Sequence, residues 1–361
     1  MKFTLALNMV RTAPSLDMRE VARHALEMVE MADEGGFEIV WAAEHHAIEL
    51  TIAPNPFQLL AWWGAHTSRI RLGTAVVVAP YWHPIKLAGE AALLDLLTDG
   101  RLEFGIGRGA YQREFDRMAG GMQQQLGVPY MQEMLPVLKA LWQGDYEHHG
   151  KYWSFPASTS VPKPLQRPHP RIWVAARDPG TYDWALANGC SIMSWAISRP
   201  FAEVEKYKGQ FDAALKAHPQ AVPPSFLTMR HTAVYARPDQ WEAPVNAVIE
   251  QSARFENLFK NLGGVQDGFA EAVDLAQLGN RAEYAPALLR ENLMFGTPEE
   301  VIAKLKRYEA LGVDYFNYSA GFGLPHAQQK NSLRLFIDEV MPAFAEKPHQ
   351  LRVASQPRRG F

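Results

Sequence analysis

The feature that most constrains this chain is a repeated alternation of short β-rich runs with helical patterns. Apolar residues recur at helical spacing over ranges such as 17–34 and 131–142, whereas 71–78 is a nearly continuous Val, Ala and Leu run. Continuous apolar runs are typical of parallel strands that are buried on both faces. The alternation therefore predicts an α/β protein built around a parallel sheet.

The number of predicted strands favours a (β/α)8 TIM barrel. A doubly wound sheet alternates in the same way but usually has fewer strands. In a barrel, the chemistry lies on the loops that follow the C-terminal ends of the strands, so functional residues are expected there. The eight strand-like runs are 3–9, 37–42, 71–78, 102–106, 171–175, 191–195, 226–235 and 313–317.

We expect one domain over residues 1–345, because α/β barrels commonly reach this size as a single unit. A hairpin around Gly150 and a polar, glycine-broken segment at about 241–287 do not fit a minimal barrel unit. We interpret both as insertions, the second as helical or as a mobile loop that could close over the site. Residues 346–361, with several Pro, Gly, Lys and Arg, are interpreted as a loose tail.

Composition narrows the class of function. The formal net charge of -3 gives no overall field that favours nucleic acid or a lipid surface. The longest apolar run, near 72–80, is too short to span a membrane. Cys190 is the single cysteine, so no intramolecular disulfide can form, which agrees with a cytoplasmic location. The first residues are expected to form a strand rather than a signal peptide.

The loop after the second predicted strand carries Glu44, His45 and His46 in succession. Two imidazoles suit the handling of protons, because an unperturbed histidine titrates near neutral pH. A polar loop whose histidines only satisfy backbone groups explains the same residue types. A zinc site needs three or four converging ligands, and His66 and His83 stand at no spacing that supplies them. We therefore expect no metal.

The loops after the third and fourth predicted strands add aromatic and basic groups. Tyr81 and Trp82, with Trp63, could wall an aromatic pocket, although simple packing explains them equally well. The run 105–110 matches the dinucleotide pattern G-x-G-x-x-A, but it lacks the acidic residue expected about 20 residues later. Its glycines would let a flat ligand approach the backbone, and Arg108 suits a phosphate. The alternative interpretation of this run is a glycine-rich turn with a purely structural role.

The loop after the fifth predicted strand leads into a helix and suits an anion. Unpaired backbone N–H groups at a helix N-terminus attract phosphate, and Arg177 and Thr181 would add to the attraction. Ordinary capping of the helix by Asp178 is the alternative. Ser194 and Trp195 follow the sixth strand and place an aromatic ring at the barrel mouth. Pattern alone thus predicts an anion site with aromatic walls.

Taken in order, these segments resemble the luciferase-like monooxygenase family over nearly the whole chain. No single motif decides the resemblance, but the ordered set is specific. It is carried by GFEIVWAAEHH at 36–46, TAVVVAPYWHP at 74–84, DGRLEFGIGRG at 99–109, SW at 194–195, GFGLPH at 321–326 and the EVMP ending of the last helix at 336–342.

The resemblance implies an FMN-binding homodimer. Reduced FMN (FMNH2) from a separate NAD(P)H:flavin reductase would react with O2 to give a C4a-hydroperoxide that oxygenates a small apolar or aromatic substrate. The catalytic histidine would be His45, with Glu44 and His46 beside it. A cis peptide bond between Ala75 and Val76 would lie beneath the isoalloxazine ring. The implied cofactor-binding residues are Ala75, Val76, Arg108, Arg177, Asp178, Thr181, Ser194 and Trp195.

Two residues depart from bacterial luciferase. Gly107 stands where luciferase has a reactive cysteine, so that thiol chemistry is absent here, and light emission is not implied. Arg177 replaces an acidic residue of the phosphate loop, a change that should still suit a phosphate.

Three alternatives compete with the FMN-dependent oxygenase. A deazaflavin (F420)-dependent oxidoreductase on the same barrel would transfer hydride without oxygen. A flavin-binding relative without turnover is disfavoured because His45 and Arg108 are retained. An NAD-binding sheet protein depends on the G-x-G-x-x-A match alone and ranks last.

Overall fold

The computed structural model describes residues 1–345; the tail interpreted at 346–361 lies outside the described residues. Parallel strands close into a barrel, because β10 pairs with β9 on one side and with β14 on the other. The predicted (β/α)8 barrel is confirmed. Its eight strands are β1 (Lys2–Ala6), β2 (Ile39–Ala42), β3 (Arg71–Thr74), β5 (Leu102–Gly107), β8 (Arg171–Ala175), β9 (Ser191–Trp195), β10 (Phe226–Val234) and β14 (Tyr315–Ser319).

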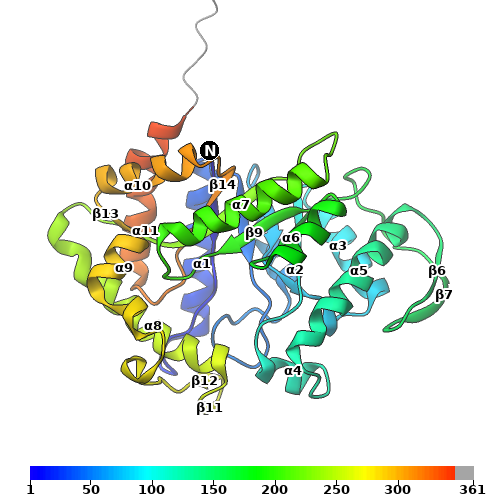
Figure 1. The fold of residues 1–361 in the computed structure, drawn as a ribbon, viewed down its shortest axis with the longest axis horizontal. Helices are drawn as coiled ribbons and strands as arrows, with labels where there is room; N and C mark the ends of the chain where they lie inside the picture. Colours follow the sequence, from blue (N-terminus) through cyan, green and yellow to red (C-terminus); the bar gives the residue numbers. More distant parts are fainter. Residues whose placement is uncertain (346–361) are drawn as a thin grey trace, which may run out of the picture.

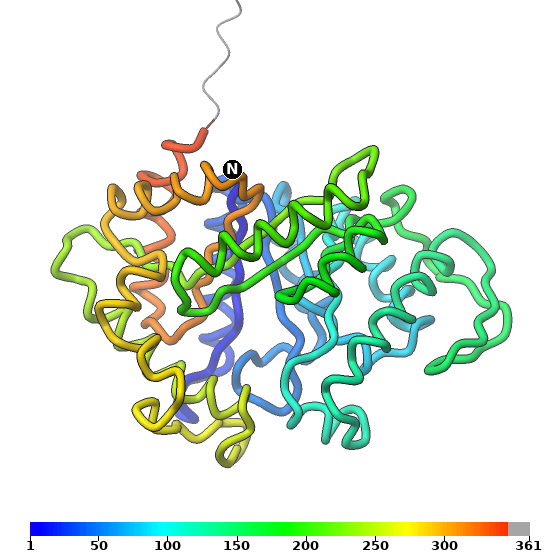
Figure 2. Tube along the Cα trace, viewed as in Figure 1, coloured from blue at the N-terminus to red at the C-terminus, as the bar shows by residue number. Residues whose placement is uncertain are grey.

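Helices surround this barrel, and Figures 1 and 2 show them on its outer side. No helix within residues 1–345 is long and apolar enough to cross a membrane. The α-helices are α1 (Met18–Glu34), α2 (Pro56–Ala65), α3 (Pro84–Leu97), α4 (Gln112–Met118), α5 (Gly127–Gln143), α6 (Pro179–Ala187), α7 (Phe201–Ala217), α8 (Glu242–Lys260), α9 (Pro286–Asn292), α10 (Pro298–Ala310) and α11 (His326–Leu335). Shorter turns are η1 (Ala79–Tyr81), η2 (Gln124–Leu126), η3 (Pro238–Trp241), η4 (Leu275–Gln277), η5 (Arg281–Tyr284), the π-helical η6 (Phe336–Val340) and η7 (Met341–Phe344).

Local signals explain several element boundaries. α10 begins with a capping box, in which the Thr297 side chain accepts from the Glu300 backbone N–H and the Glu300 side chain accepts from the Thr297 N–H. Pro298 occupies the first turn, where its missing N–H costs nothing. The predicted bounds of α3, β8 and β9 agree with the structure.

Several predicted strands have other bounds in the structure. The first ends at Ala6 instead of 9, and the second begins at Ile39 instead of 37. The run 71–78 is not one strand: it divides into β3 and the two-residue β4 (Val77–Val78), separated by Ala75 and Val76, whose peptide bond is cis. The last barrel strand runs two residues further than its predicted range, because Tyr318 and Ser319 still pair with β1 and β10.

The two insertions lie in different parts of the molecule. β6 (Tyr146–His149) and β7 (Ser154–Ser158) form the predicted hairpin, which projects at one edge in Figure 1. The segment 241–287 contains α8 and the small hairpin of β11 (Val265–Gln266) and β12 (Phe269–Ala270). Beyond it, β13 (Met294–Gly296) pairs with the end of β10. Gly268 accepts from the Glu49 backbone N–H, so the β11–β12 hairpin contacts the loop after β2.

The interior of the barrel is filled at the N-terminal ends of its strands. Glu103 of β5 accepts from Arg71 and Arg171, with Arg171 Nε at 2.7 Å, and from Trp173 Nε1 at 2.6 Å. Arg171 also donates to the Tyr315 hydroxyl at 3.0 Å. The carboxylate is buried and paired with two guanidiniums, and this ion cluster blocks the lower end of the barrel.

Candidate functional site

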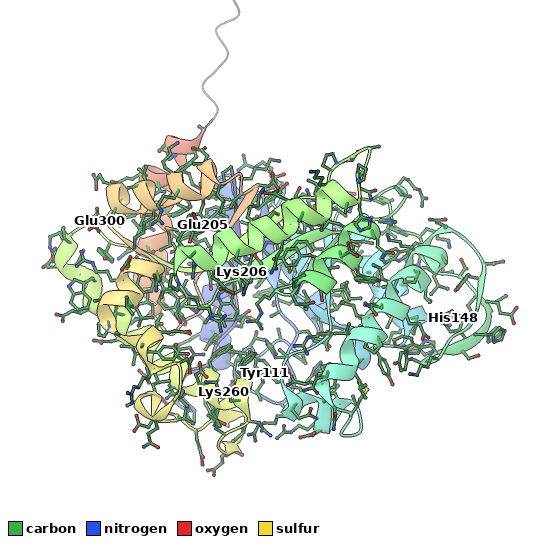
Figure 3. All side chains as sticks on the ribbon, in the orientation of Figure 1. Tyr111, His148, Glu205, Lys206, Lys260 and Glu300 are labelled. Carbon is green, nitrogen blue, oxygen red and sulfur yellow. The ribbon has the colours of Figure 1, made fainter. Side chains whose placement is uncertain are left out.

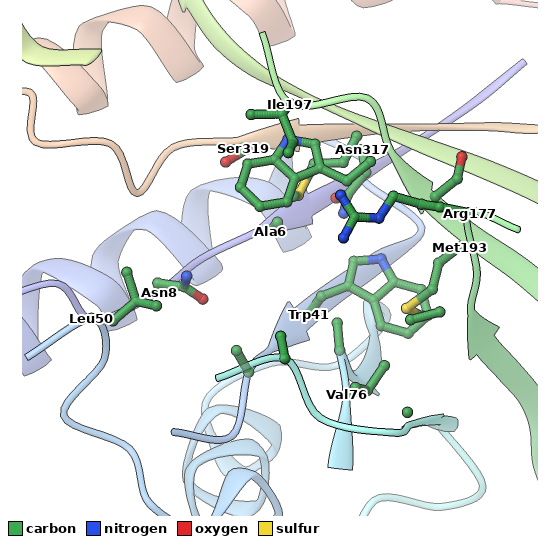
Figure 4. Close-up of a pocket in the computed structure, with 18 of the residues that line it drawn as sticks. Ala6, Asn8, Trp41, Leu50, Val76, Arg177, Met193, Ile197, Asn317 and Ser319 are labelled. Atoms are coloured by element: carbon green, nitrogen blue, oxygen red, sulfur yellow. The ribbon is translucent and has the colours of Figure 1, made fainter. Parts of the chain in front are cut away.

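A cavity of about 550 Å³ opens at the C-terminal ends of the barrel strands. Its volume lies within the usual range for small-molecule sites. Figure 4 shows part of its wall, with Asn317 and Ser319 from β14 and Trp41 from β2. The predicted residues that line it are Glu44, His45, Ala75, Val76, Arg108, Arg177, Asp178, Thr181, Ser194 and Trp195.

His45 lies in the cavity wall against a buried carboxylate. Its Nδ1 is 3.3 Å from both carboxylate oxygens of Glu114, on α4. A carboxylate can only accept, so the hydrogen bond requires the proton on Nδ1 and leaves Nε2 as an acceptor. Glu114 also accepts from the His46 backbone N–H at 2.6 Å, which fixes the loop after β2 against α4.

Glu44 and His46 form a second pair behind His45. The buried Glu44 carboxylate accepts from His46 Nε2 at 2.8 Å, from the Val78 N–H at 2.8 Å and from the Trp82 indole. Burial alone would lower the pKa of His46. The hydrogen bond and charge of Glu44, with the charge of Glu114, outweigh burial and raise that pKa. Glu44 lines the cavity, whereas His46 lies outside its wall, against Tyr81.

Two guanidiniums face the same cavity from neighbouring strands. Arg108 follows β5 and Arg177 follows β8, and within residues 1–345 neither forms a salt bridge. Burial, and then the charge of Arg177, lower the pKa of Arg108. Figure 4 shows the Arg177 side chain reaching into the cavity near Asn317 and Trp41. Two guanidiniums without salt bridges in one cavity favour the binding of an anion.

Asp178 and Thr181 form hydrogen bonds with each other. Asp178 caps α6, accepting from the Thr181 backbone N–H at 2.9 Å and from its hydroxyl at 2.7 Å. Asp178 therefore acts as an ordinary helix cap, which was the alternative interpretation of this residue. Both residues still line the cavity beside Arg177.

Ala75, Val76 and Gly107 form one part of the cavity wall. Ala75 and Val76 line it through the cis peptide bond that the family resemblance implied. A Cβ at Gly107 would lie 2.5 Å from the Val76 side chain, so a glycine is needed there. The buried indole N–H groups of Trp41 and Trp195, both in the wall, have no partner among the described residues.

Three predicted pocket residues lie behind the wall rather than in it. Trp63 is completely buried in α2, because its helix turns that face toward the barrel core. Trp82 donates to Glu44, and Tyr81 packs on His46 and Phe115. These aromatic residues support the histidine–carboxylate loop instead of contacting the hollow.

Several lining residues were not predicted. Glu114 lies on α4, a short polar helix without apolar periodicity, so no pattern identified it. His231, Phe255 and Tyr111 also face the cavity, from β10, α8 and the start of α4. The glycine-broken composition of 241–287 suggested a cover for the site but not which α8 side chains face it. Among residues 1–345, no group of three or more His, Cys, Asp or Glu could hold a metal ion.

Comparison with known protein families identifies the chain. The family model described as luciferase-like monooxygenase matches residues 1–315. The chain belongs to the luciferase-like monooxygenase family. It is a flavin-dependent monooxygenase, as the resemblance of its motifs predicted.

Individual relatives agree with this assignment. The oxygenase component of the flavin-dependent trigonelline monooxygenase of Acinetobacter baylyi is 39% identical over 355 residues, covering 98% of this chain and 99% of its own length. The crystal structure of the monooxygenase RslO1 from Streptomyces bottropensis has a TM-score of 0.80 at 25% identity, covering 96% of this chain and all of that one. An F420-dependent secondary alcohol dehydrogenase has a TM-score of 0.72 at 15% identity, covering 96% and 99%, and shows only a shared fold.

Proposed function

We propose that this enzyme is the oxygenase component of a two-component system. It would take FMNH2 from a separate NAD(P)H:flavin reductase and insert one atom of O2 into a small aromatic substrate. The observation that carries the proposal is the combination, in one cavity, of two guanidiniums without salt bridges and a buried histidine–carboxylate pair. The Acinetobacter relative is the oxygenase component of a flavin-dependent monooxygenase, which supports the need for a separate reductase.

The residues of the cavity fit FMN. Arg108 and Arg177 would bind the phosphate, with the Thr181 end of α6 beside them. Val76 and Gly107, which both line the cavity, would lie against the flat ring system. Bound FMNH2 would supply the two electrons that oxygen activation requires.

His45 is proposed as the catalytic residue. Its Nε2 is the nitrogen that Glu114 leaves free, so it can accept or return a proton inside the cavity. Glu114 is proposed as a positioning residue, since it contacts His45 and the His46 backbone. Glu44 and His46 would hold the loop in place from behind. The helix α8 covers the cavity and would limit the access of water.

The test compares flavins directly. The purified chain is titrated with FMN, FMNH2 and F420. The reduced complex is then mixed with O2 in the presence of trigonelline, the compound after which the Acinetobacter relative is named. We expect FMNH2 to bind and an oxygenated product to form, detected by mass with labelled O2. Absence of FMNH2 binding contradicts the proposal. Binding of F420 with hydride transfer would instead support the dehydrogenase alternative.

A homodimer in the cytoplasm completes the proposal. α3 exposes Leu93, Leu96 and Leu97, an apolar surface of a kind that marks protein contacts. We propose that a second copy of the chain covers it, and light scattering should then give the mass of two chains. The single cysteine, Cys190, is buried and free, in agreement with a reducing compartment.

A further inference from the structure

The cavity has a neutral polar corner where β10 meets β14. The parallel register of these strands pairs His231 with Ser319, and His231 Nδ1 lies 3.0 Å from the Ser319 hydroxyl. Asn317 lies two residues before Ser319, so its side chain leaves the same face of β14. All three side chains line the cavity, and Figure 4 shows Asn317 and Ser319 in its wall. We call His231, Asn317 and Ser319 the β10–β14 corner.

This corner has hydrogen-bonding groups that no protein group uses. His231 Nε2 has no hydrogen-bond partner among residues 1–345, and the partly exposed ring lines the cavity. The Asn317 side-chain oxygen accepts from the Thr4 hydroxyl at 2.9 Å, whereas its amide nitrogen has no partner among the described residues. One ring nitrogen and one amide N–H group are therefore available to a ligand.

The corner carries no charge at neutral pH. Burial, and then the charge of Arg230, lower the pKa of His231 to about 4, so this ring is neutral. Arg230 leaves the opposite face of β10, where its guanidinium donates to the Tyr308 hydroxyl and to the Ile197 carbonyl. The charge of Arg230 therefore acts on His231 from outside the cavity.

The corner lies across the barrel from residues that are proposed to hold the flavin. The closed strand order is β1, β2, β3, β5, β8, β9, β10 and β14, so β10 is opposite β3 and β14 is opposite β5. Val76 follows β3, Gly107 ends β5, and Arg108 follows β5. A flavin bound on that side of the cavity would leave the corner to the substrate.

Aromatic rings flank the corner. The Trp195 and Phe322 rings lie 5.7 Å and 5.1 Å from the His231 ring. Phe255 of α8 packs 5.5 Å from Trp195, so the inserted helix borders the same space. The Trp195, Phe322 and Phe255 rings all line the cavity. Neutral polar groups between apolar rings suit an aromatic molecule that carries a hydrogen-bonding substituent.

We propose that the β10–β14 corner binds the hydroxyl group of an uncharged phenol. His231 and Asn317 then determine which aromatic substrates the enzyme accepts. A hydroxyl can donate to His231 Nε2 and accept from the Asn317 amide, so it uses both free positions. His231 Nδ1 then carries the ring proton and donates to the Ser319 hydroxyl. A carboxylate would find no cation in this corner, because Arg108 and Arg177 follow β5 and β8.

This inference rests on the proposed function, because it names the class of substrate for the same cavity. It assigns a separate side of the cavity to each partner, with the flavin toward β3 and β5 and the substrate toward β10 and β14.

The test compares phenol with toluene, which has nearly the same shape but a methyl group in place of the hydroxyl. Their binding to the FMN-loaded protein and to the protein without FMN is measured by calorimetry. In a cavity without partners for the hydroxyl, toluene would bind more tightly, because burying an unpaired hydroxyl costs free energy. We expect phenol to bind more tightly than toluene. Equal affinities, tighter binding of toluene, or no binding of phenol overturn the inference.

Substitutions at His231 separate its hydrogen bond from its shape. His231→Leu should weaken phenol about tenfold, the loss expected when a buried hydroxyl loses its partner, and should change toluene less than about twofold. His231→Gln keeps a hydrogen-bonding group and should keep phenol within about threefold of the native chain. Equal losses of both compounds in His231→Leu mean that the ring only fills space, which overturns the inference.

His24→Leu is the matched control. His24 is also buried, and burial lowers its pKa to about 4, but it lies on α1 and does not line the cavity. This variant should leave both affinities unchanged. If it weakens phenol as much as His231→Leu does, the loss does not come from the corner and the inference is overturned.

The two proposals can fail separately. If FMN and FMNH2 do not bind while the preference for phenol persists without flavin, the proposed function is wrong and the phenol site stands. If FMNH2 binds and O2 is consumed but phenol binds no more tightly than toluene, the phenol site is wrong and the oxygenase stands.

Discussion

Each end of the barrel buries a glutamate carboxylate, but the two carboxylates have different hydrogen-bond partners. At the N-terminal end Glu103 is held by Arg71 and Arg171, which stay charged at any physiological pH. At the C-terminal end Glu114 is held by one ring nitrogen of His45, which leaves the other nitrogen free. The same barrel therefore carries a closed ion cluster at its N-terminal end and an open histidine–carboxylate pair at its C-terminal end.

This difference assigns different tasks to the two ends. The ion cluster at the N-terminal end fills its space, and its carboxylate has all its hydrogen bonds. Loss of the cluster should therefore lower the free energy of unfolding. The site at the C-terminal end contains a cavity and two cations without salt bridges. Changes there should therefore reduce ligand affinity and turnover. Stability and function can then be changed independently, and four measurements test that separation.

The largest effect is expected at the upper end, in His45→Gln. Product formation should fall by about 10²- to 10⁴-fold, the usual contribution of a general acid or base, while FMN binding stays within twofold. The free energy of unfolding should change by less than about 1 kcal/mol. Steady-state product assays and chemical denaturation give both quantities.

His148 supplies the matched control. It also pairs with a glutamate, Glu133 at 3.1 Å, but it lies on the β6–β7 hairpin, and Figure 3 shows it far from Tyr111, a residue of the cavity wall. His148→Gln should leave turnover unchanged. If His45→Gln behaves like His148→Gln, the proposed catalytic role is wrong.

At the lower end, Glu103→Ala should cost about 3 kcal/mol of unfolding free energy, because it strands two partly buried guanidiniums. Their side chains are 27% and 33% exposed, which keeps the loss below that of a fully buried pair. The exposed Lys2–Glu38 pair is the control, and Glu38→Ala should cost less than about 1 kcal/mol. Similar losses in the two variants would show that the cluster contributes no more than a surface pair.

Arg108→Ala returns to the upper end with a smaller effect. FMN affinity should fall about ten- to a hundredfold, as expected for a charge-assisted contact to phosphate, while riboflavin affinity stays within twofold. Fluorescence titration with both flavins measures the difference. An equal loss for FMN and riboflavin would mean that Arg108 acts on the ring system or on the shape of the loop.

The smallest effect concerns pH and His231. Burial, followed by the charge of Arg230, lowers its pKa from 6.5 to about 4. Between these pH values the unfolded chain binds a proton that the folded chain does not, so stability falls as the pH falls, by up to about 1.4 kcal/mol per pH unit. His231→Gln should reduce the slope of unfolding free energy against pH by that amount. An unchanged slope would show that the His231 ring is protonated in the folded chain.

Elements with strong local signals could be predicted from sequence. The capping box at Thr297 and the apolar runs of β8 and β9 fix those elements by chemistry that lies within a few residues. Arg108 and Arg177 were placed correctly at strand ends because a barrel dictates where its loops meet. The roles proposed for these residues still await experiment.

The features that the sequence did not predict depend on which way a side chain points and on contacts between distant segments. Trp63 was expected in the pocket, yet its helix turns it inward, and residue type cannot reveal which way a ring points. Glu114 could be recognised as a site residue only from the structure, because folding brings α4 against the loop after β2. That loop lies nearly 70 positions earlier in the sequence. Phe255 joined Tyr111 and Trp195 by the same long-range folding.

The position of α8 has a consequence for how such enzymes diversify. Its residues stand outside the closed ring of eight strands, in a segment inserted between β10 and β14. The flavin-facing groups proposed here belong to the barrel loops, whereas Phe255 belongs to the inserted helix. A lineage could therefore exchange this helix and acquire new substrates while inheriting its oxygen chemistry unchanged.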